Sequence, residues 1–395
     1  MRYFIMHLLI SSSLFLVRLE ALVSGRVRGR IFSTTGLLNR CNRNLCALSA
    51  SKDLEDDPSP AQDAENLEYL QGQLRILEQT DNYLVVEKPP SVVCHHSGYT
   101  GSRKNNEVPM LQRIRQALRQ EMSNEKNNDV DFDATEMDDE DTRVNLIHRL
   151  DRGCSGCLLV GRPQVAEHDV TTRLLNQAMQ APSTSKTYIA LVRGEGIVRE
   201  RNFMEEGWFT VDRPITNERG KKNDAVTHFR FIAGQDNGGG TIDRPRASLV
   251  LCRPVTGRWH QIRKHLNGLS HPILGDAVHG DRYVNREWKE RYGMLAERTC
   301  LHLARIDMEP LVTSEPPHAT IVPGSGLHVS CPLAPDMRYM LQTYLPDVWE
   351  AALPLLAQEG VFLEEDEDGT NTQGKRVLDF TVPRPRDDQV TSSTE

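Results

Sequence analysis

One stretch of the chain, residues 144–162 (VNLIHRLDRGCSGCLLVGR), constrains the fold more than any other. Two apolar runs flank a polar segment in which Asp151 is the single carboxylate. Apolar runs of this kind are typical of buried strands, and glycine and serine between them mark a tight loop. Loops on a rigid scaffold often carry a protein's chemistry. The stretch therefore predicts two strands whose connection presents Asp151, although a surface ion pair of Arg149 and Asp151 would give the same pattern.

Two further stretches combine polar residues with an apolar strand or a helix. Residues 185–194 (SKTYIALVRG) place Tyr188 near the start of a predicted strand. Residues 256–281 (TGRWHQIRKHLNGLSHPILGDAVHGD) form a basic block that contains Arg263. Within this block, residues 260–269 have the apolar spacing of a helix.

Taken together, the three stretches resemble the signature of the RluA-type pseudouridine synthases. That signature is HRLDxxTSG, then KxYxAxVxG, then TGRxHQIRxHL followed by HPIxGDxxYG. The resemblance runs from about Leu74 to about Trp349, and residues 224–229 (DAVTHF) and 279–281 (HGD) are most similar to the tRNA pseudouridine synthase C branch. The resemblance implies an α+β fold, a single pseudouridine-synthase catalytic domain with a bent mixed, mainly antiparallel sheet flanked by helices.

The same resemblance implies the reaction and its residues. The chain is expected to isomerise uridine to pseudouridine in RNA, with tRNA as the leading substrate, uridine 65 as the candidate position and no cofactor. The catalytic residues would be Asp151, Tyr188 and Arg263. Arg263 would form an ion pair that keeps the Asp151 carboxylate ionised. Tyr188 would stack on the target base, with its hydroxyl placed for proton transfer at C5. Whether Asp151 attacks C1′, attacks C6 or takes the C2′ proton stays open.

A second set of residues is predicted to bind RNA. Arg149 matches the family residue that enters the RNA stack when the target nucleotide leaves it, and a guanidinium group stacks well on bases. His148 is interpreted as a structural or RNA-contacting residue, and the others as phosphate contacts. The predicted RNA-binding residues are Arg149, His148, Arg258, His260 and Lys264.

Charge supports an RNA partner once the chain is divided into segments. The formal net charge is −8. Outside residues 1–73, 121–141 and 354–395, however, the chain carries 34 basic and 27 acidic side chains. A basic body is the expected electrostatic footprint of an RNA-binding protein, although an excess of Lys and Arg is also common on solvated surfaces. We expect RNA as the partner, no membrane association of the mature form, and a monomer.

Cysteine usage and two departures from the motifs bear on the site. Eight cysteines in a chain of this length form no disulfide framework, which favours a reduced compartment. Cys154 and Cys157 form a CxxC without a second ligand pair at zinc spacing, so we predict no metal site. Cys154 stands where the family has Thr, and Ser91 stands where it has Gly.

The chain is predicted to have five parts. The first 52 residues read as a targeting segment, because an apolar run near the N-terminus precedes an Arg-rich stretch without Asp or Glu, and this favours a plastid or a mitochondrion. Acid-rich composition predicts a linker, an insertion and a tail without stable structure. The predicted parts are residues 1–52 (targeting), 53–73 (acidic linker), 74–353 (catalytic domain), about 121–142 (disordered insertion within it) and 354–395 (acidic disordered tail).

Two alternatives stay open at this point. The same chemistry could act on ribosomal RNA or messenger RNA. A protein of a different class, an RNA-binding or RNA-chaperone protein without catalysis, is the second, and the departures at Ser91 and Cys154 leave room for it.

Overall fold

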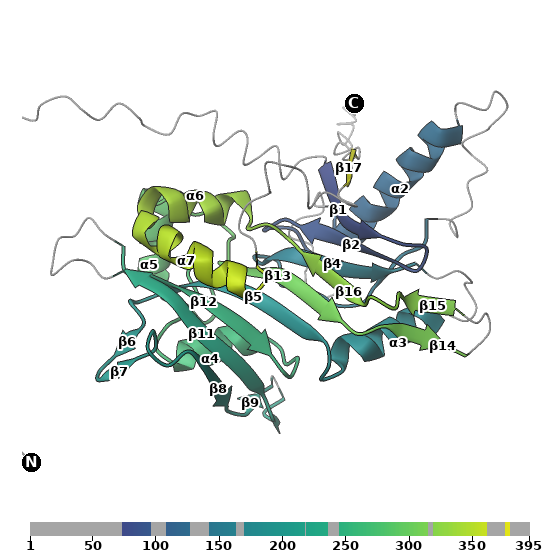
Figure 1. The fold of residues 1–395 in the computed structure, drawn as a ribbon. Coiled ribbons are helices and arrows are strands. Elements are labelled where there is room, and N and C mark those ends of the chain that lie inside the picture. Colours follow the sequence, from purple (N-terminus) through teal and green to yellow (C-terminus); the bar gives the residue numbers. More distant parts are fainter. Residues whose placement is uncertain are drawn as a thin grey trace, which may run out of the picture. The chain divides into compact units, whose positions relative to one another are not determined.

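A mixed sheet of 11 strands carries the part of the chain that the structure describes (Figure 1). The structure is a computed structural model. It describes residues 73–95, 108–126, 142–162, 170–217, 219–235, 245–314, 319–361 and 376–379. These residues belong to one unit, residues 58–395.

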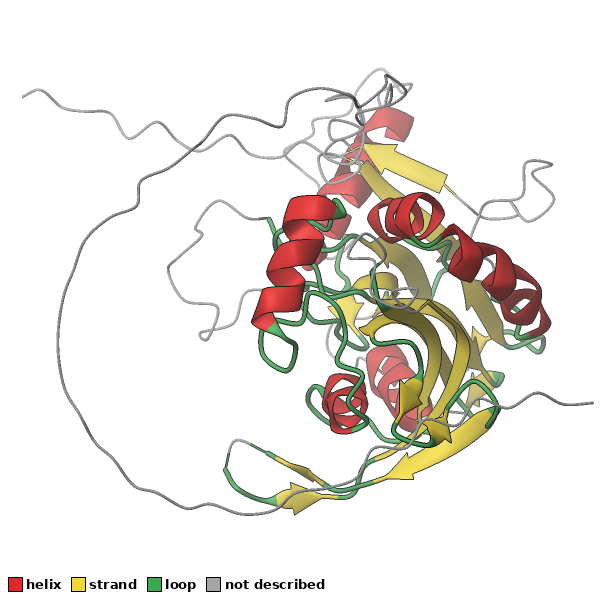
Figure 2. Cartoon of the chain, turned by 90° about the vertical axis from the view of Figure 1, so that its left-hand side faces the viewer, coloured by secondary structure: helices red, strands yellow, loops and turns green. Residues whose placement is uncertain are grey.

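The strands of the large sheet come from along the whole described chain. They are β1 (Gln73–Gln79), β2 (Tyr83–Lys88), β3 (Asn145–Leu146), β4 (Ser155–Gly161), β5 (Ser185–Arg193), β8 (Trp208–Asp212), β11 (Val226–Gln235), β12 (Ala247–Pro254), β13 (Leu301–Met308), β16 (Leu327–Ser330) and β17 (Arg376–Asp379). Their order is β17-β1-β2-β4-β13-β5-β12-β11-β8, with β16 paired to β13 and β3 paired to β4. Among the described strands, β13 and β4 pair in parallel and the other pairings of this sheet are antiparallel. The predicted mixed, mainly antiparallel sheet is therefore confirmed, and Figure 2 shows its bend.

Helices and short ribbons surround the sheet. The ribbons are β6 (Ile197–Val198) with β7 (Arg201–Asn202), β9 (Ile215–Thr216) with β10 (Lys222–Asn223), and β14 (Leu311–Thr313) with β15 (Ala319–Val322). The helices are α2 (Met110–Lys126), α3 (Val170–Gln180), α4 (Gln261–Gly268), α5 (Arg282–Arg291), α6 (Pro335–Tyr344) and α7 (Pro346–Gln358). Helices α4 and α7 both pack on β11 and β12, α3 packs on β4, and α2 packs on β1 and β17.

β4, which follows the Asp151 loop, and the neighbouring strands β2 and β5 are deeply buried, whereas the two residues of β3 before the loop are half-buried. Every residue of β2 and of β4 is buried, and so are Ile189 to Val192 of β5. Continuous apolar runs are typical of strands that are covered on both faces. A close-packed interior resists deformation, so these strands form a rigid base for the loop between β3 and β4.

Most predicted elements are present, with ends that differ by a few residues. β1 and β2 form the expected hairpin, and β5 and β12 contain the strands predicted at residues 186–192 and 247–252. The helix predicted at residues 260–269 is α4, which begins one residue later. The helix predicted at residues 165–179 is α3, which is described from Val170.

The predicted acidic insertion begins too early. Helix α2 continues to Lys126, through the first six residues of the expected segment, residues 121–126. At the other boundary Thr142 is buried. Acidic composition alone therefore missed a helix that continues on the apolar spacing of the residues before it. Residues 127–141 lie outside the described residues.

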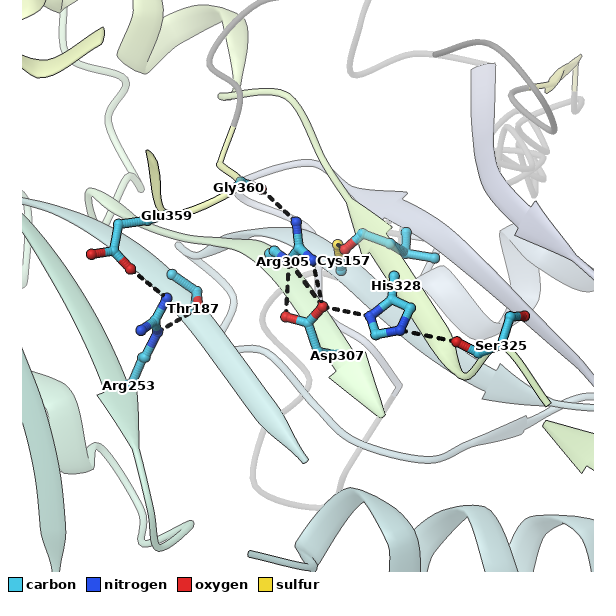
Figure 3. A network of polar contacts seen from close by, with 10 residues as sticks. Cys157, Thr187, Arg253, Arg305, Asp307, Ser325, His328, Glu359 and Gly360 are labelled. Atoms are coloured by element: carbon cyan, nitrogen blue, oxygen red, sulfur yellow. Dashed lines mark hydrogen bonds and ion pairs between the residues drawn. The ribbon is translucent and has the colours of Figure 1, made fainter. Parts of the chain in front are cut away.

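The predicted disordered tail is wrong at its start and in one later segment. Helix α7 ends at Gln358, and Leu356 and Val361 are both buried. Figure 3 shows how the next residues are held, since Glu359 is bound to Arg253 and the Gly360 carbonyl oxygen accepts a hydrogen bond from Arg305 at 2.8 Å.

The later segment of the tail is a strand. β17 pairs with β1 in antiparallel register, with Leu378 opposite Leu74. The acidic average of residues 354–395 hid short apolar segments that find partners only in the folded chain. Edge strand β1 presents backbone groups that another strand can pair with, and β17 meets that requirement.

Predictions for the N-terminal part of the chain lie outside the described residues. These are the targeting segment, residues 1–52, and the linker except for its last residue, Gln73, which begins β1. In the described part of the chain, no helix has the length and apolar character needed to cross a membrane.

Candidate active site

Asp151 lies in the loop between β3 and β4, as the sequence predicted. The Asp151 carbonyl oxygen accepts a hydrogen bond from the Cys154 amide at 3.0 Å, which closes a tight turn. The Asp151 side chain is 38% exposed, whereas the neighbouring Leu150 is buried. Gly153 is required here, because a Cβ would lie 2.6 Å from the Glu297 carbonyl oxygen. The loop therefore presents one carboxylate at the surface of a buried sheet.

Two buried cations hold this loop in place. The Lys88 ammonium donates to backbone oxygens that include those of Arg152 at 3.1 Å and Cys154 at 2.6 Å. Burial lowers the pKa of Lys88 to about 8. Arg298 is also fully buried and donates to the Gly153 carbonyl oxygen at 2.9 Å. Buried hydrogen bonds of this kind are costly to break, so they restrict the position of the Asp151 backbone.

Helix α4 supplies the partner of Asp151. Arg263 Nη1 donates to Asp151 Oδ2 at 2.7 Å. The other side of the guanidinium group is bound by Asp276, with Nε to Oδ2 at 2.7 Å and Nη2 to Oδ1 at 2.6 Å. The side chains of Arg263 and Asp276 are 7% and 0% exposed. A two-point contact with a buried carboxylate fixes the plane of the guanidinium group, which then meets Asp151 from a defined direction.

The electrostatics of the pair follow from this arrangement. Burial by itself would raise the pKa of Asp276, but hydrogen bonds from Arg263 and from the backbone amides of His279 and Val278 outweigh it, and the pKa is lowered. Burial would lower the pKa of Arg263, yet Asp276 and then Asp151 raise it above its ordinary value. Arg263 is therefore a permanent positive charge at the Asp151 carboxylate.

Two histidines line the site beside Asp151. His260 Nε2 lies 3.6 Å from Asp151 Oδ2, and His260 Nδ1 lies 3.0 Å from His279 Nε2. Burial lowers the pKa of His260 to about 4, more than the neighbouring carboxylate Asp151 raises it. The ring is therefore neutral at neutral pH. A neutral ring in these contacts is a weaker phosphate ligand than the sequence implied.

Tyr188 enters from β5. Its Cα lies opposite Cys252 in β12 and opposite Leu303 in β13, so the residue stands in the middle of the sheet. Burial raises the pKa of the Tyr188 hydroxyl, and Cys154 and Asp151 add to the effect. The phenol is therefore protonated at neutral pH.

Thr227, in the DAVTHF segment, connects β11 to the third stretch of sequence. Gln261 donates through Nε2 to Thr227 Oγ1 at 2.9 Å, and His265 Nδ1 lies 3.0 Å from the same oxygen. Gln261 Oε1 in turn accepts from the Arg258 amide and from the Thr256 hydroxyl. These contacts attach the start of α4 to β11 and so help to place Arg263, two residues further along the helix.

The predicted RNA-binding residues lie in different environments. Arg149 is exposed, and its Nη1 lies 3.5 Å from His95 Nε2. Arg258 is exposed and donates to the Asp224 carbonyl oxygen at 3.0 Å. The Lys264 ammonium lies 4.4 Å from the centre of the Trp259 ring.

His148 has a structural contact. Its Nε2 accepts a hydrogen bond from the Leu159 amide in β4 at 3.0 Å. Burial lowers the pKa of His148 to about 3. The neutral ring supports the strand and carries no charge for a phosphate.

Four residues near the site were missed from the sequence. The signal for Asp276 was available, since it is the first carboxylate after the basic run of the third stretch. The signal for Lys88 was a lysine at the end of an apolar strand, directly before two prolines. His279 and Trp259 gave no signal, because their places depend on how the loop after α4 folds back. The missed residues are Lys88, Trp259, Asp276 and His279.

The cysteines do not form a metal site among the described residues. Cys154 and Cys157 are free thiols and buried. Burial raises the pKa of Cys154 to about 12, so the thiol stays protonated. No group of three His, Cys, Asp or Glu residues in the described ranges could hold a metal ion. Cys154 packs under the loop, where the family has a threonine.

Comparisons with known proteins identify the relatives of this chain. Residues 82–268 match the family described as RNA pseudouridylate synthase. The chain is 31% identical over 256 residues to tRNA pseudouridine synthase C of Salmonella typhimurium, covering 62% of this chain and 83% of that protein. It is 29% identical to the proteins of the same name from Yersinia pestis and Pectobacterium carotovorum. These alignments cover 61% and 62% of this chain, 83% of the Yersinia protein and 57% of the Pectobacterium protein.

Solved structures give a similar list of relatives. Human RNA Pseudouridylate Synthase Domain Containing 4 has a TM-score of 0.47 and 18% identity, covering 72% of this chain and 97% of that chain. Human RNA Pseudouridylate Synthase Domain Containing 1 has a TM-score of 0.42 and 18% identity, covering 72% and 94%.

The sequence comparisons define the class of this protein as an RNA-modifying isomerase. The chain belongs to the RluA-type RNA pseudouridine synthase family, within which it is similar to the tRNA pseudouridine synthase C proteins.

Proposed function

We propose that this protein converts uridine to pseudouridine in tRNA and that Asp151 is the residue that works on the glycosidic bond. One observation carries the proposal, which is the 2.7 Å ion pair between Asp151 and Arg263, with Arg263 held by Asp276. It leaves an accessible carboxylate beside a fixed positive charge. A carboxylate in this setting can serve as a nucleophile or a base.

The reaction needs little more than a carboxylate and a pocket. The bond between N1 and C1′ breaks, the uracil turns, C5 joins C1′, and the proton lost from C5 is balanced by one gained at N1. No oxidant, reductant or cofactor enters this balance. Asp151 assists bond cleavage, either by attack on the uridine or by removal of the C2′ proton, and is released unchanged.

Tyr188 is assigned to the base. Its aromatic ring offers a stacking surface for a uracil that has left its RNA stack. A protonated phenol also donates a hydrogen bond to a uracil oxygen. Because a neutral phenol is a weak base, the proposed proton transfer at C5 requires the Tyr188 hydroxyl to pass on its own proton at the same time.

The RNA itself is held by basic residues around the site. Arg149 is exposed two residues before Asp151 and can fill the stack from which the target uridine has turned out. Arg258 precedes α4 and Lys264 lies within it, and both are proposed to contact phosphates. We propose that the protein acts as a monomer, without a membrane partner.

The choice of tRNA rests on the names of the relatives and on the DAVTHF and HGD segments. Uridine 65 is the candidate position. Ribosomal RNA and messenger RNA are the competing substrates, and a non-catalytic RNA-binding protein is the competing function.

The test is pseudouridine mapping at nucleotide resolution after incubation of the full chain with unmodified tRNA and with ribosomal RNA. The full chain is needed because α7 and β17 belong to the fold. Asp151→Asn is measured in parallel. A new pseudouridine in tRNA that disappears in the variant supports the proposal. Pseudouridine only in ribosomal RNA would mean that ribosomal RNA, and not tRNA, is the substrate. RNA binding without any pseudouridine would favour a non-catalytic RNA-binding protein.

Targeting to a plastid or a mitochondrion is a separate proposal from the composition of residues 1–52. A fluorescent fusion of residues 1–66 tests it, and a cytosolic signal would contradict it.

A further inference from the structure

Trp259 is an exposed aromatic residue that the reaction described above does not use. Its side chain is 49% exposed, although it lies between two residues of the basic block, Arg258 and His260. A single exposed apolar side chain is common on protein surfaces, so the neighbours of Trp259 decide what it can do. The other tryptophans are less exposed, since Trp288 and Trp349 are buried and Trp208 is half-buried.

The indole of Trp259 is connected to the catalytic carboxylate by one ring. The Trp259 and His260 rings stack with centroids 3.8 Å apart and planes at 22°. His260 Nε2 then lies 3.6 Å from Asp151 Oδ2. Consecutive residues can stack in this way because His260 has a left-handed backbone, with φ of 55°. The strained conformation places Trp259 one ring away from the site.

Charge completes the surface. The Lys264 ammonium lies 4.4 Å from the Trp259 ring centre. Arg258, the residue directly before Trp259 in the chain, is exposed. Proteins that hold single-stranded nucleic acid combine aromatic rings that stack on bases with basic groups that follow the phosphates. An aromatic ring with a cation over it, next to a second basic residue in the chain, can bind the base and the phosphate of one nucleotide.

We propose that Trp259 is the stacking site for a nucleobase that flanks the target uridine, with Lys264 at the phosphate of that nucleotide. The inference rests on the proposed function for the identity of the neighbouring nucleotide, and it names a contact that this function does not require. When RNA binds, the Lys264 ammonium moves from the indole to the phosphate and a base covers the exposed part of the ring. Base stacking on Trp259 also fixes the distance of the RNA backbone from Asp151.

Fluorescence provides a direct measurement. Stacking of a base on an indole quenches its emission, so unmodified tRNA and ribosomal RNA are each titrated into the full chain carrying Asp151→Asn, which prevents turnover. We expect quenching by the RNA that binds, its loss in Trp259→Phe, and its persistence in the matched variant Trp208→Phe. Quenching that persists in Trp259→Phe would overturn the proposal.

Affinity and kinetics give the second measurement. Trp259→Ala should weaken RNA binding and raise KM about tenfold, as expected for one lost base stack, with kcat within about twofold. Trp259→Phe should recover most of the affinity. Val312→Ala removes another exposed apolar side chain, from β14, and should change neither value. Unchanged affinity and KM in Trp259→Ala, or a loss of thermal stability alone, would show that Trp259 only covers His260.

The two proposals fail in different ways. Quenching at Trp259 without pseudouridine in any RNA would reject the proposed function and keep the stacking site. Pseudouridine formation that is insensitive to Trp259→Ala would reject the stacking site and keep the function.

Discussion

Two clusters on the sheet bring arginine together with a carboxylate, Asp151 in one and Glu359 in the other. They differ in how many hydrogen-bond donors the carboxylate accepts from. At the active site Asp276 holds Arg263 at two points, and Asp151 makes its contacts in the described part of the chain through Oδ2. At the end of α7 the reverse holds, because Glu359 accepts from several donors at once. The difference separates a carboxylate that is available for chemistry from one that holds the chain together.

The Glu359 cluster is a structural anchor. Glu359 Oε1 accepts from Trp208 Nε1 at 3.0 Å and from Arg230 Nη1 at 2.6 Å, and Oε2 accepts from Arg253 Nη2 at 2.9 Å. Figure 3 shows Arg253 reaching on to Thr187 in β5. Four strands, β5, β8, β11 and β12, are thereby tied to the end of one helix. These three hydrogen bonds occupy most of the roughly four acceptor sites of the carboxylate, which leaves little capacity for a substrate.

The exposed fractions agree with this division. The Asp151 side chain is 38% exposed and the Glu359 side chain 15%. An arginine and a carboxylate alone therefore do not identify an active site. The proposal for Asp151 rests on the unused hydrogen-bonding capacity of an accessible carboxylate.

The largest expected effect is on catalysis. Asp151→Asn should lower kcat by about 10³-fold or more, because an amide is neither a nucleophile nor a base of comparable strength. RNA affinity and the unfolding midpoint should change little, since Asp276 still holds Arg263. Single-turnover pseudouridine formation and thermal unfolding measure the two quantities. If the variant were as active as the unsubstituted chain, Asp151 would not take part in the chemistry, and the contrast between the Asp151 and Glu359 clusters would be wrong.

The next effect is on stability at the same site. Asp276→Asn leaves the buried guanidinium of Arg263 with half of its partners and should lower the free energy of unfolding by about 3 kcal/mol. Activity should fall as well, since Arg263 is no longer oriented. Urea unfolding measures the loss. The double variant Arg263→Met, Asp276→Asn removes both charges and should recover part of the stability while remaining inactive, which a general packing defect would not do.

The anchor should respond in the opposite way. Glu359→Gln weakens the hydrogen bonds from Arg230 and Arg253 and should lower the free energy of unfolding by about 1–2 kcal/mol. The kcat of the folded protein should match that of the unsubstituted chain. A selective loss of kcat without loss of stability would mean that the two clusters do not divide the work as described.

Acid should affect both clusters alike. Burial would raise the pKa of Asp276 and of Glu359, but their donors outweigh it and both pKa values are lowered. A carboxyl group with a lowered pKa stabilises the folded state above its unfolded value of about 4, and this contribution is lost as the pH falls below that value. The free energy of unfolding should fall by up to ~1.4 kcal/mol per pH unit for each group. Asp276→Asn and Glu359→Gln should each make the slope below pH 4 shallower, and an unchanged slope would contradict the assignment.

The smallest effect concerns Ser91, the residue that replaces the family glycine. It has φ of 64°, the left-handed conformation that glycine adopts without strain. Its carbonyl oxygen accepts from Arg152 Nε at 3.3 Å, beside Asp151. Ser91→Gly should raise the free energy of unfolding by about 0.5 kcal/mol and leave kcat unchanged. A change in kcat, measured where both proteins are fully folded, would show that the strained backbone of Ser91 affects the Asp151 loop.

Much of the fold could be read from local patterns. Alternating and continuous apolar runs located β1, β2, β4, β5 and β12, because a strand between covered faces needs such residues. Composition averages failed where short apolar segments were embedded in acidic ones. Leu356, Val361 and β17 pack or pair only against distant parts of the chain, so no local pattern marks them.

In the candidate site, too, some features could be predicted from local sequence and others depended on the folded chain. Asp151, Tyr188 and Arg263 were named from motifs in three separate stretches, and the structure places Arg263 in contact with Asp151 and Tyr188 near it. The motifs did not show that Asp276 would bind Arg263 from behind, or that His148 and His260 would be neutral. Protonation states depend on burial and on neighbours contributed by other elements.

The sequence by itself therefore determined the family and the mainly antiparallel sheet, and it named the residues that we propose for the reaction, because those depend on periodicity and on short motifs. Only the tertiary structure decided which carboxylate keeps free hydrogen-bonding capacity and which one is held by several donors. Hydrogen-bond saturation is a property of atoms brought together from different strands and helices. That is why we propose opposite roles for Asp151 and Glu359, although each carboxylate contacts arginine on the same sheet.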